Sequence, residues 1–478
     1  MTRIFNLFCV CAEKGVHGRI IPESKDSIPA CEKQRFSEEP SERPSMEYTL
    51  EDHVLMIDDV PRIPQIDIID DDEDEDSIKR TRESLSSLRF ESDHEEGKNH
   101  ILITDEGLSV RKPNKSEMKW QSKITTDEYI SIRELGRGAG GFVELALHAP
   151  TMRLVALKFV SIEDHEHVRQ LRNEILTFTH DRILHPNILQ CDGGCLNSTK
   201  AVCKLQYMDI GSLKSIVARS GAIPEKYLRP MARQILSGLA HLHDLKIIHR
   251  DLKPENILAS SEGILKIADF GIAKCVPRQT KFKDVVGTQW IQSPERVKKR
   301  QYSFSADIWS FGMCMMYCAE GGVPVSRDYW AFVETIAEQK LPEIGRRFSK
   351  QFRHFVDQCL RLCPEHRPEA AKALKHPGLT KKSDDGKLDQ FFAHTLSKRK
   401  SIQDINSILS KLNSWVREHP DEQATRMTEL CRIAKDPRIQ KVTSALMVDE
   451  AVFCKELKQI LRNSSSTSPQ QHKACMMH

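Results

Sequence analysis

Short segments between residues 130 and 160 alternate apolar residues with polar or small ones, and this pattern predicts β-strands. Ile130–Leu135 and Phe142–Leu147 both follow the period of a strand with one buried face. A third strand, apolar until its last residue, runs from Val155 to Lys158. Because glycines separate the first two strands, we expect a hairpin followed by a third strand.

Helical spacing begins after these strands. Val168, Leu171, Ile175 and Phe178 recur at intervals of three and four residues, which predicts a helix with one apolar face. The longest apolar run, Ile308–Ala319, is too short to cross about 30 Å of hydrocarbon. It predicts a buried core helix, and we expect no transmembrane segment.

The two ends of the chain differ from this patterned middle. Residues 13 to about 120 are rich in Ser, Pro and charge, with seven consecutive acids from Asp70 to Asp76, and such a composition favours disorder. Near the other end, apolar residues repeat at helical spacing in Ile402–Val416 and again in Phe453–Ile460. We therefore expect a mostly disordered regulatory and docking arm (1–128), a globular core (129–380), a small helical extension (381–463) and a disordered tail (464–478).

Composition narrows the class of protein. The 71 basic and 68 acidic residues leave a net charge of only +3 over 478 residues, so no overall field marks a nucleic-acid binder. The 14 cysteines are scattered without the paired spacing of a zinc site, which is typical of reduced thiols in the cytoplasm or the nucleus. Cys9, Cys11 and Cys475 lie near the two ends, where lipid attachment and plain thiols are both open interpretations.

Gly136, Gly138 and Gly141 form a G-x-G-x-x-G motif, which occurs in two kinds of nucleotide-binding site. A dinucleotide-binding fold requires a helix at the last glycine, but the segment after Gly141 predicts a strand. We therefore expect a glycine hairpin that lays backbone N–H groups over a triphosphate. Lys158 would bind the α- and β-phosphates as a compact cation. Glu174, on the inward ridge of the predicted helix, would be its partner.

The most specific motif is His249-Arg-Asp-Leu-Lys-Pro-Glu-Asn256, and the triplet Asp269-Phe-Gly begins 18 residues after Asp251. Together with the glycine hairpin, the strand lysine and the helix glutamate, these elements have the order and spacing of a eukaryotic protein kinase domain, which residues 130–380 resemble. The resemblance implies an α+β bilobal fold with a β-rich N-lobe and a helical C-lobe. It also implies an enzyme that uses ATP and Mg²⁺ to phosphorylate a protein substrate.

The resemblance gives each site residue a role. Asp251 would orient the substrate hydroxyl or accept its proton, and Lys253 would stabilise the transferring phosphoryl group. Asn256 and Asp269 would hold Mg²⁺, which neutralises charge on the phosphates. Because phosphoryl transfer has a loose transition state, such a site works by positioning and electrostatics. The implied nucleotide-binding residues are Gly136, Gly138, Gly141, Val143, Ala156, Lys158, Gln206 and Met208.

Scaffold residues of the family are present as well. By the same resemblance, Glu295 in Ser-Pro-Glu would pair with Arg367, and Asp307 would hydrogen-bond the backbone of the catalytic loop. None of the expected catalytic positions is replaced. An active kinase is therefore favoured over a protein that uses the fold only to bind nucleotide or partners.

The segment Ser293–Gly312 resembles the mitogen-activated protein kinase kinases in particular, notably in Ser-Pro-Glu-Arg and Tyr-Ser-x-x-Ala-Asp-Ile-Trp-Ser. This resemblance implies a dual-specificity enzyme that phosphorylates Ser or Thr, and also Tyr, in a mitogen-activated protein kinase. It also implies an upstream activating kinase. Leu252 and Glu255 are commoner in other serine/threonine kinases, so a general serine/threonine kinase remains the alternative.

Two residues of the expected activation loop suggest how the enzyme is switched. Thr280 and Asp284 lie eight and four residues before Thr288, where the kinase-kinase group usually has two phosphorylatable residues. A carboxylate carries about one charge where a phosphate carries up to two. We therefore expect Asp284 to supply a partial permanent charge, Thr280 to be the phosphorylated switch, and Arg250 to face an activating phosphate.

A docking segment for the target kinase is also expected in the N-terminal arm. The basic residues within Lys79–Arg82 precede the apolar residues Leu85, Leu88 and Phe90. Kinases of this group often bind their targets through a basic segment followed by a hydrophobic one. The segment lies in the arm that precedes the globular core, but disordered segments commonly contain such strings, so a chance occurrence is the alternative.

Overall fold

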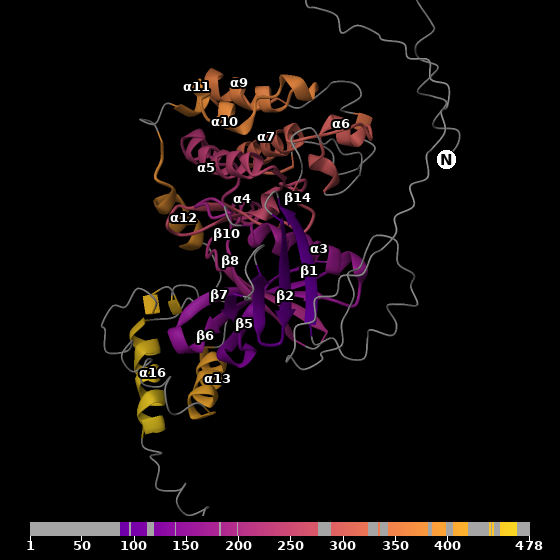
Figure 1. The fold of residues 1–478 in the computed structure, drawn as a ribbon. Coiled ribbons are helices and arrows are strands. Elements are labelled where there is room, and N and C mark those ends of the chain that lie inside the picture. The colour runs from indigo at the N-terminus through magenta and orange to yellow at the C-terminus, as the bar shows by residue number, and fades with distance from the viewer. Residues whose placement is uncertain are drawn as a thin grey trace, which may run out of the picture. The chain divides into compact units, whose positions relative to one another are not determined.

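A computed structural model gives the fold of the chain (Figure 1). Cys9, Cys11 and Cys475, the candidates for lipid attachment, lie outside the residues that it describes. The described residues are 87–94, 97–111, 119–138, 140–180, 183–197, 199–275, 288–323, 333–334, 343–380, 385–397, 405–418, 439–440, 442–443 and 450–465.

The centre of the N-lobe is an antiparallel five-stranded sheet in the order β5-β6-β7-β9-β8. The first three of these strands contain the segments that the alternating pattern predicted. β5 and β6 form the expected hairpin, whose last pair is Gly138 with Gly141. The strands are β5 (Tyr129–Gly138), β6 (Gly141–His148), β7 (Arg153–Ser161), β8 (Cys191–Asn197) and β9 (Lys200–Gln206).

Helix α3 (His165–Phe178) packs against β7. Its N-terminus is capped by Asp164, whose side chain accepts a hydrogen bond from the Glu166 N–H at 2.9 Å. Leu171 and Ile175 are buried in the N-lobe core, as the helical spacing predicted. One face of the helix is therefore fixed against the sheet, and the side chains on that face point toward β7.

A second sheet forms within residues 87–123, at the end of the N-terminal arm. The prediction that residues 1–128 are mostly disordered as a whole stays a prediction. The strands of this sheet pair in the order β1-β2-β3-β4 and contact β8. Ile101, Ile103 and Val110 are buried in the same cluster as residues of β9. The charge-rich composition obscured these short strands, whose apolar residues are buried in one cluster with residues of β7, β9 and α3. The strands are β1 (Ser87–His94), β2 (Gly97–Thr104), β3 (Gly107–Arg111) and β4 (Lys119–Lys123).

This sheet corrects part of the docking hypothesis. Leu88 lies on β1 and is 6% exposed within the N-lobe core. A partner protein therefore cannot reach its side chain without opening the sheet. Lys79–Leu85 and the side chain of Phe90 lie outside what the structure describes.

Helix α7 (Ser305–Glu320) is the centre of the C-lobe. Every residue from Ala306 to Ala319 is buried, as expected for a helix that is apolar on all sides. Gly321, whose φ of 81° is in the left-handed region, ends the helix. α5 and α9 pack on it. The other C-lobe helices are α4 (Leu213–Ser220), α5 (Glu225–Asp244), α6 (Pro294–Val297), α9 (Lys350–Cys359), α10 (Ala370–Ala373) and α11 (Pro377–Thr380).

Short paired strands in the C-lobe bring the two acidic motifs together. The loop between β11 and β12 contains His249–Asn256, and the loop between β13 and β14 contains Asp269. β11 pairs with β14, and β12 pairs with both β13 and β10. These strands are β10 (Gly211–Ser212), β11 (Ile247–Ile248), β12 (Ile257–Ala259), β13 (Leu265–Ile267) and β14 (Lys274–Cys275).

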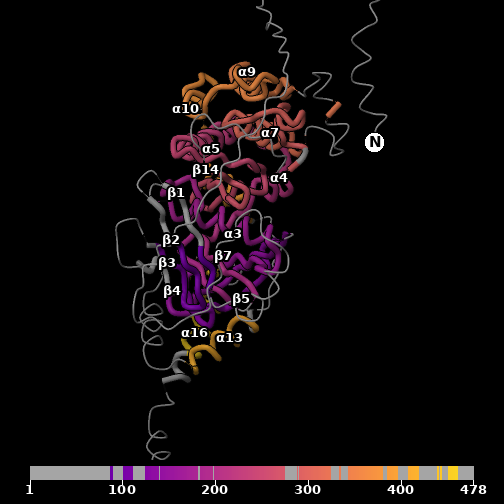
Figure 2. Tube along the Cα trace, turned by 45° about the vertical axis from the view of Figure 1, so that its right-hand side comes forward, coloured from indigo at the N-terminus to yellow at the C-terminus, as the bar shows by residue number. Residues whose placement is uncertain are grey.

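Beyond the C-lobe, helices α12 (Leu388–Ser397), α13 (Ile405–Glu418) and α16 (Glu450–Ser465) form a C-terminal extension. α16 continues through residues 464 and 465, where the sequence predicted the tail. α13 lies beside β5 in both views (Figures 1 and 2), although it is far from it in the sequence, and α16 packs on α13. None of the described helices is long and apolar enough to span a membrane. The β-rich N-lobe and the helical C-lobe confirm the predicted α+β bilobal fold.

Candidate active site

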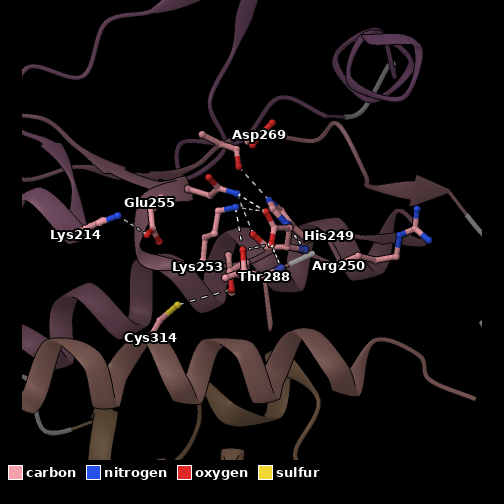
Figure 3. Close-up of polar contacts among 12 residues, drawn as sticks. Lys214, His249, Arg250, Lys253, Glu255, Asp269, Thr288 and Cys314 are labelled. Atoms are coloured by element: carbon pink, nitrogen blue, oxygen red, sulfur yellow. Dashed lines mark hydrogen bonds and ion pairs between the residues drawn. The ribbon is translucent and has the colours of Figure 1, made fainter. Parts of the chain in front are cut away.

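The carboxylate of Asp251 receives hydrogen bonds from three neighbouring residues. Its Oδ1 accepts from the backbone N–H and the hydroxyl of Thr288, both at 2.9 Å. Its Oδ2 accepts from Lys253 Nζ and, at 3.3 Å, from Asn256 Nδ2. Lys253 Nζ also donates to Thr288 Oγ1 at 3.1 Å, and Figure 3 shows these two side chains meeting. The network fixes a carboxylate beside a cation, as needed to orient a hydroxyl next to a phosphoryl group.

Lys158 lies between two carboxylates that come from different lobes. Its Nζ is 2.6 Å from Glu174 Oε2 on α3 and 3.2 Å from Asp269 Oδ1, which follows β13. The pair of Lys158 with Glu174 forms as predicted, and the structure adds the contact with Asp269. The lysine therefore links the sheet, the helix and the carboxylate that is expected to bind the metal ion.

These three charged groups shift one another's pKa values. Burial disfavours the charged form of Lys158, but the carboxylates of Asp269 and Glu174 outweigh it and raise the pKa of the lysine. The ammonium of Lys158 lowers the pKa of Asp269. Burial raises the pKa of Glu174, and Lys158 opposes this rise. Lys158 is thus cationic and Asp269 anionic at neutral pH, the states that bind phosphate and a metal ion.

The turn of the glycine hairpin has one position that only glycine fits and two that are open. Gly141 has a φ of 156°, and a Cβ built there would lie 1.8 Å from the carbonyl oxygen of Phe159. A Cβ at Gly136 or Gly138 would meet no heavy atom of the described chain within 4 Å. The backbone of the turn is therefore accessible on the side of Gly136 and Gly138. A phosphate chain fits such a surface.

Apolar side chains next to the hairpin form a surface against which the planar adenine base of ATP could pack. Ala156 on β7 and Met208 after β9 are buried in one cluster, and the half-buried Val143 of β6 packs against it. Gln206, the last residue of β9, is exposed. Of the expected nucleotide-binding residues, the structure therefore brings Val143, Ala156 and Met208 together, and it places the Gln206 side chain toward solvent.

Asn256 and Asp269 form a donor set that fits Mg²⁺. The Ala268 N–H donates to the Asn256 carbonyl oxygen at 2.8 Å, which holds the two loops together. Asn256 Nδ2 donates to the Asp251 carbonyl oxygen at 3.0 Å, so the amide is oriented and its oxygen is the atom that would bind the ion. The Asp269 side chain is 46% exposed. A bound Mg²⁺ would neutralise charge on the phosphates.

The described residues contain no cluster of three or more His, Cys, Asp or Glu that would hold a metal on its own. In phosphoryl-transfer sites, Mg²⁺ is usually bound by one or two protein groups together with phosphate oxygens and water.

Asp307 of α7 binds the backbone of the catalytic loop. The carboxylate is 1% exposed and accepts from the backbone N–H of His249 at 2.9 Å and of Arg250 at 3.0 Å. His243 Nε2 lies 3.0 Å from it. Arg250 has a φ of 68°, in the left-handed region. The buried carboxylate thus stabilises a backbone conformation that a non-glycine residue adopts at a cost, in the role that the resemblance implied.

The expected regulatory residues are only partly described. Arg250 Nε donates to the Ile272 carbonyl oxygen at 2.5 Å, and its Nη1 donates to the Tyr302 hydroxyl at 3.5 Å. The guanidinium therefore lies where the segment after Asp269 leaves the site. Thr280 and Asp284 lie outside the described residues, and their roles stay predictions.

An ion pair that the sequence did not predict lies at the side of the site. Lys214 Nζ on α4 lies 3.0 Å from Glu255 Oε1 in the catalytic loop, and Figure 3 shows the pair apart from the network of Lys253 and Thr288. The two residues are distant in the sequence, and no periodicity connects them. Only the folded chain identifies Glu255 as a partly exposed carboxylate that already has a cation.

Known proteins resemble this chain over the region that contains the site. A family model described as a protein kinase domain matches residues 129–379. Mitogen-activated protein kinase kinase 1c of Physcomitrium patens is 36% identical over 268 residues, which are 53% of this chain and 77% of the relative. Mitogen-activated protein kinase kinase 3 of Arabidopsis thaliana is 34% identical over 254 residues, 52% of this chain and 49% of the relative.

A relative with a different name is similar as well. Mitogen-activated protein kinase kinase kinase A of Dictyostelium discoideum is 34% identical over 260 residues, 52% of this chain and 28% of the relative. The chain therefore spans about three quarters of one of these relatives, half of the second and little more than a quarter of the third.

Proposed function

The chain belongs to the protein kinase family, and from this premise we propose that it is a mitogen-activated protein kinase kinase. It transfers the γ-phosphate of ATP to Ser or Thr, and to Tyr, in the activation loop of a mitogen-activated protein kinase. The observation that carries the proposal is the similarity to the Physcomitrium kinase kinase, at 36% identity over 77% of that protein. The Ser293–Gly312 segment supports the same group.

The described side chains support a direct transfer to a protein hydroxyl. Asp251 is held by Thr288 and Lys253, so its carboxylate has one orientation in which to align the hydroxyl. Lys253 and Lys158 place two cations where negative charge develops on the phosphoryl oxygens. Most of the rate enhancement in this reaction comes from such positioning and charge stabilisation.

The proposed switch is phosphorylation of Thr280 by an upstream kinase. Asp284 supplies a standing charge at the second of the two positions, four residues before Thr288. A carboxylate has about half the charge of a phosphate, so the unphosphorylated enzyme has low activity rather than none.

Phosphosite mapping tests the proposal. The 478-residue protein is incubated with a mitogen-activated protein kinase, ATP and Mg²⁺, and an Asp251→Asn variant serves as the control. Phosphate on both the Thr and the Tyr of the target's activation loop, absent with the variant, is the expected result. No phosphate on that loop, with phosphate on other serine or threonine substrates, would contradict the kinase-kinase assignment but not the protein kinase activity.

A second candidate function is a serine/threonine kinase that acts at another level of the cascade. The similarity to the kinase kinase kinase of Dictyostelium favours it, as do Leu252 and Glu255 of the catalytic loop. Such an enzyme would phosphorylate a kinase kinase rather than a mitogen-activated protein kinase. Adding a recombinant kinase kinase to the same mapping experiment distinguishes the two.

A further inference from the structure

The described part of residues 385–465 forms what we call the C-terminal strap, and its first segment is fixed to the C-lobe. Asp385 forms an ion pair with Arg233 of α5. Phe391 of α12 stacks on Tyr227 of α5, with the ring centroids 4.4 Å apart. The other residues of this segment that are buried in the C-lobe core are Leu388 and Phe392.

The second segment of the strap packs on the N-lobe. Apolar side chains of α13 and α16 form one buried cluster with Ile130 of β5 and Leu147 of β6, two residues that pair across the glycine hairpin. Lys411 Nζ of α13 donates to the Ser131 carbonyl oxygen at 3.2 Å. Strap residues at the centre of the cluster include Leu412, Trp415, Phe453 and Leu457.

The strap contacts a strand that has only one neighbour in its sheet. Among the described strands, β5 is at the edge of the order β5-β6-β7-β9-β8, so its outer row of backbone groups faces no described strand. Lys411 binds one of these groups, the carbonyl oxygen of Ser131. α13 and α16 therefore support the outer edge of this sheet.

The same strand leads directly into the nucleotide-binding turn. β5 runs from Tyr129, just before the strap contacts at Ile130 and Ser131, to Gly138 in the turn. Its other end has weaker support, since neither Gly136 nor Gly138 would bring a Cβ within 4 Å of any described heavy atom. β5 pairs with β6 from its base to the turn, with register shifts between Ser131 and Arg133 and between Glu134 and Gly136. A shift at the base therefore reaches the turn through the paired strands. The position of the turn over Lys158 and Asp269 thus depends on how the base is held.

We propose that the C-terminal strap positions the glycine hairpin for ATP by tying the edge strand β5 to the C-lobe. Lys411 and Leu412 of α13 are positioning residues in this arrangement, because they touch β5 or its cluster and not the nucleotide. The inference rests on the kinase fold and not on the identity of the protein substrate. Its test is therefore independent of whether the proposed target kinase is the substrate.

ATP binding and hydrogen exchange test the proposal in the 478-residue chain. The dissociation constant for ATP is measured by titration in the presence of MgCl₂, and amide exchange is followed in β5 and in α7. Leu412→Asp places a charge in the buried cluster, where the wild-type side chain is 0% exposed. We expect it to weaken ATP binding about tenfold and to speed exchange in β5, while α7 stays protected.

Two further variants make the result specific. Lys411→Ala removes a single surface hydrogen bond, and we expect it to weaken ATP binding about two- to threefold without disturbing the cluster. Ser410→Asp puts the same charge on the exposed side of α13, and we expect no change in either measurement.

Two results would overturn the proposal. One is unchanged ATP binding and unchanged β5 exchange in Leu412→Asp, which would show that the strap contacts the strand without positioning it. The other is simultaneous loss of protection in β5 and α7, since the strap would then serve the stability of the whole fold.

Discussion

Arg367 binds Glu295 through two parallel hydrogen bonds, each of 2.7 Å, between the guanidinium and the two carboxylate oxygens. The two side chains are 0% and 5% exposed. Arg367 Nε also donates to the Arg361 carbonyl oxygen at 2.8 Å. Two segments that are far apart in the sequence are thus joined by a pair with no access to water.

Glu295→Gln tests the cost of breaking this buried pair. The variant leaves the Arg367 guanidinium buried without a counter-charge, so we expect the free energy of unfolding to fall by about 3–5 kcal/mol. Urea denaturation measures the change. The matched control is Asp357→Asn, which removes the pair of Asp357 with Arg361 at 3.1 Å. This pair is on the surface, and we expect a loss below about 1 kcal/mol; equal losses in both variants would contradict the argument.

Asp307→Asn tests how much the Asp307 carboxylate stabilises the catalytic loop. The lowered pKa of this group predicts that its contribution to stability depends on pH. Burial opposes the ionisation of Asp307, but the hydrogen bond and charge of His243, together with the His249 N–H, outweigh it and lower the pKa. A lowered pKa means that the contribution of the carboxylate to stability is complete above its unfolded pKa of about 3.9 and is lost as the pH falls through the lower folded pKa.

We therefore expect the free energy of unfolding of Asp307→Asn to be about 2–4 kcal/mol lower than that of the wild type at pH 7. The difference should stay constant down to about pH 4 and shrink below it. Denaturation curves at a series of pH values give the comparison. A difference that shrinks already between pH 7 and pH 5 would show that another group is responsible.

Thr288→Val separates the hydroxyl of this residue from its backbone. The N–H bond to Asp251 at 2.9 Å remains possible, but the hydroxyl bonds to Asp251 and Lys253 are lost. We expect kcat to fall about tenfold, because the Asp251 carboxylate loses one of the hydrogen bonds that hold it in a single orientation. Thr288→Ser keeps the hydroxyl and should restore most of the activity. Equal rates for the Val and Ser variants would contradict a role of the hydroxyl.

Glu174→Gln removes the carboxylate nearest to Lys158 Nζ, at 2.6 Å. We expect kcat/KM for ATP to fall at least about tenfold, because the ammonium loses the partner that places it on the phosphates. Steady-state kinetics with varied ATP measures the change. Glu166→Gln is the control on the same helix, because the Glu166 side chain is 55% exposed, and it should leave the rate unchanged.

Thr280→Ala tests the proposed switch. We expect the variant to stay at the basal rate after treatment with the upstream kinase that activates the wild type, because its remaining acidic residue, Asp284, carries about one charge. The rate of phosphate transfer to a mitogen-activated protein kinase is the measurement. A Thr280→Ala protein as active as the activated wild type would show that the switch is elsewhere.

The catalytic residues could be predicted because they occur in short, contiguous sequence motifs. His249–Asn256 and Asp269 occur in motifs whose order and spacing resemble a protein kinase domain, and Lys158 lies at the end of the apolar run Val155–Leu157 on β7. Glu174 could be placed by helical spacing together with the presence of Lys158 as a cation to pair with. For these residues, the local pattern and the tertiary fold agree, and the structure places Lys158 and Glu174 2.6 Å apart.

The N-terminal sheet and the place of the C-terminal strap were decided only by the tertiary structure. Ile101 and Val110 lie in a segment whose charge favoured disorder, yet they are buried against the N-lobe. Leu412 and Phe453 follow a clear helical period, but that period indicates only that one face is apolar. Hydrophobic burial is not directional, so the sequence by itself determined which faces must be covered, and only the folded chain decided that β5 and β6 cover them.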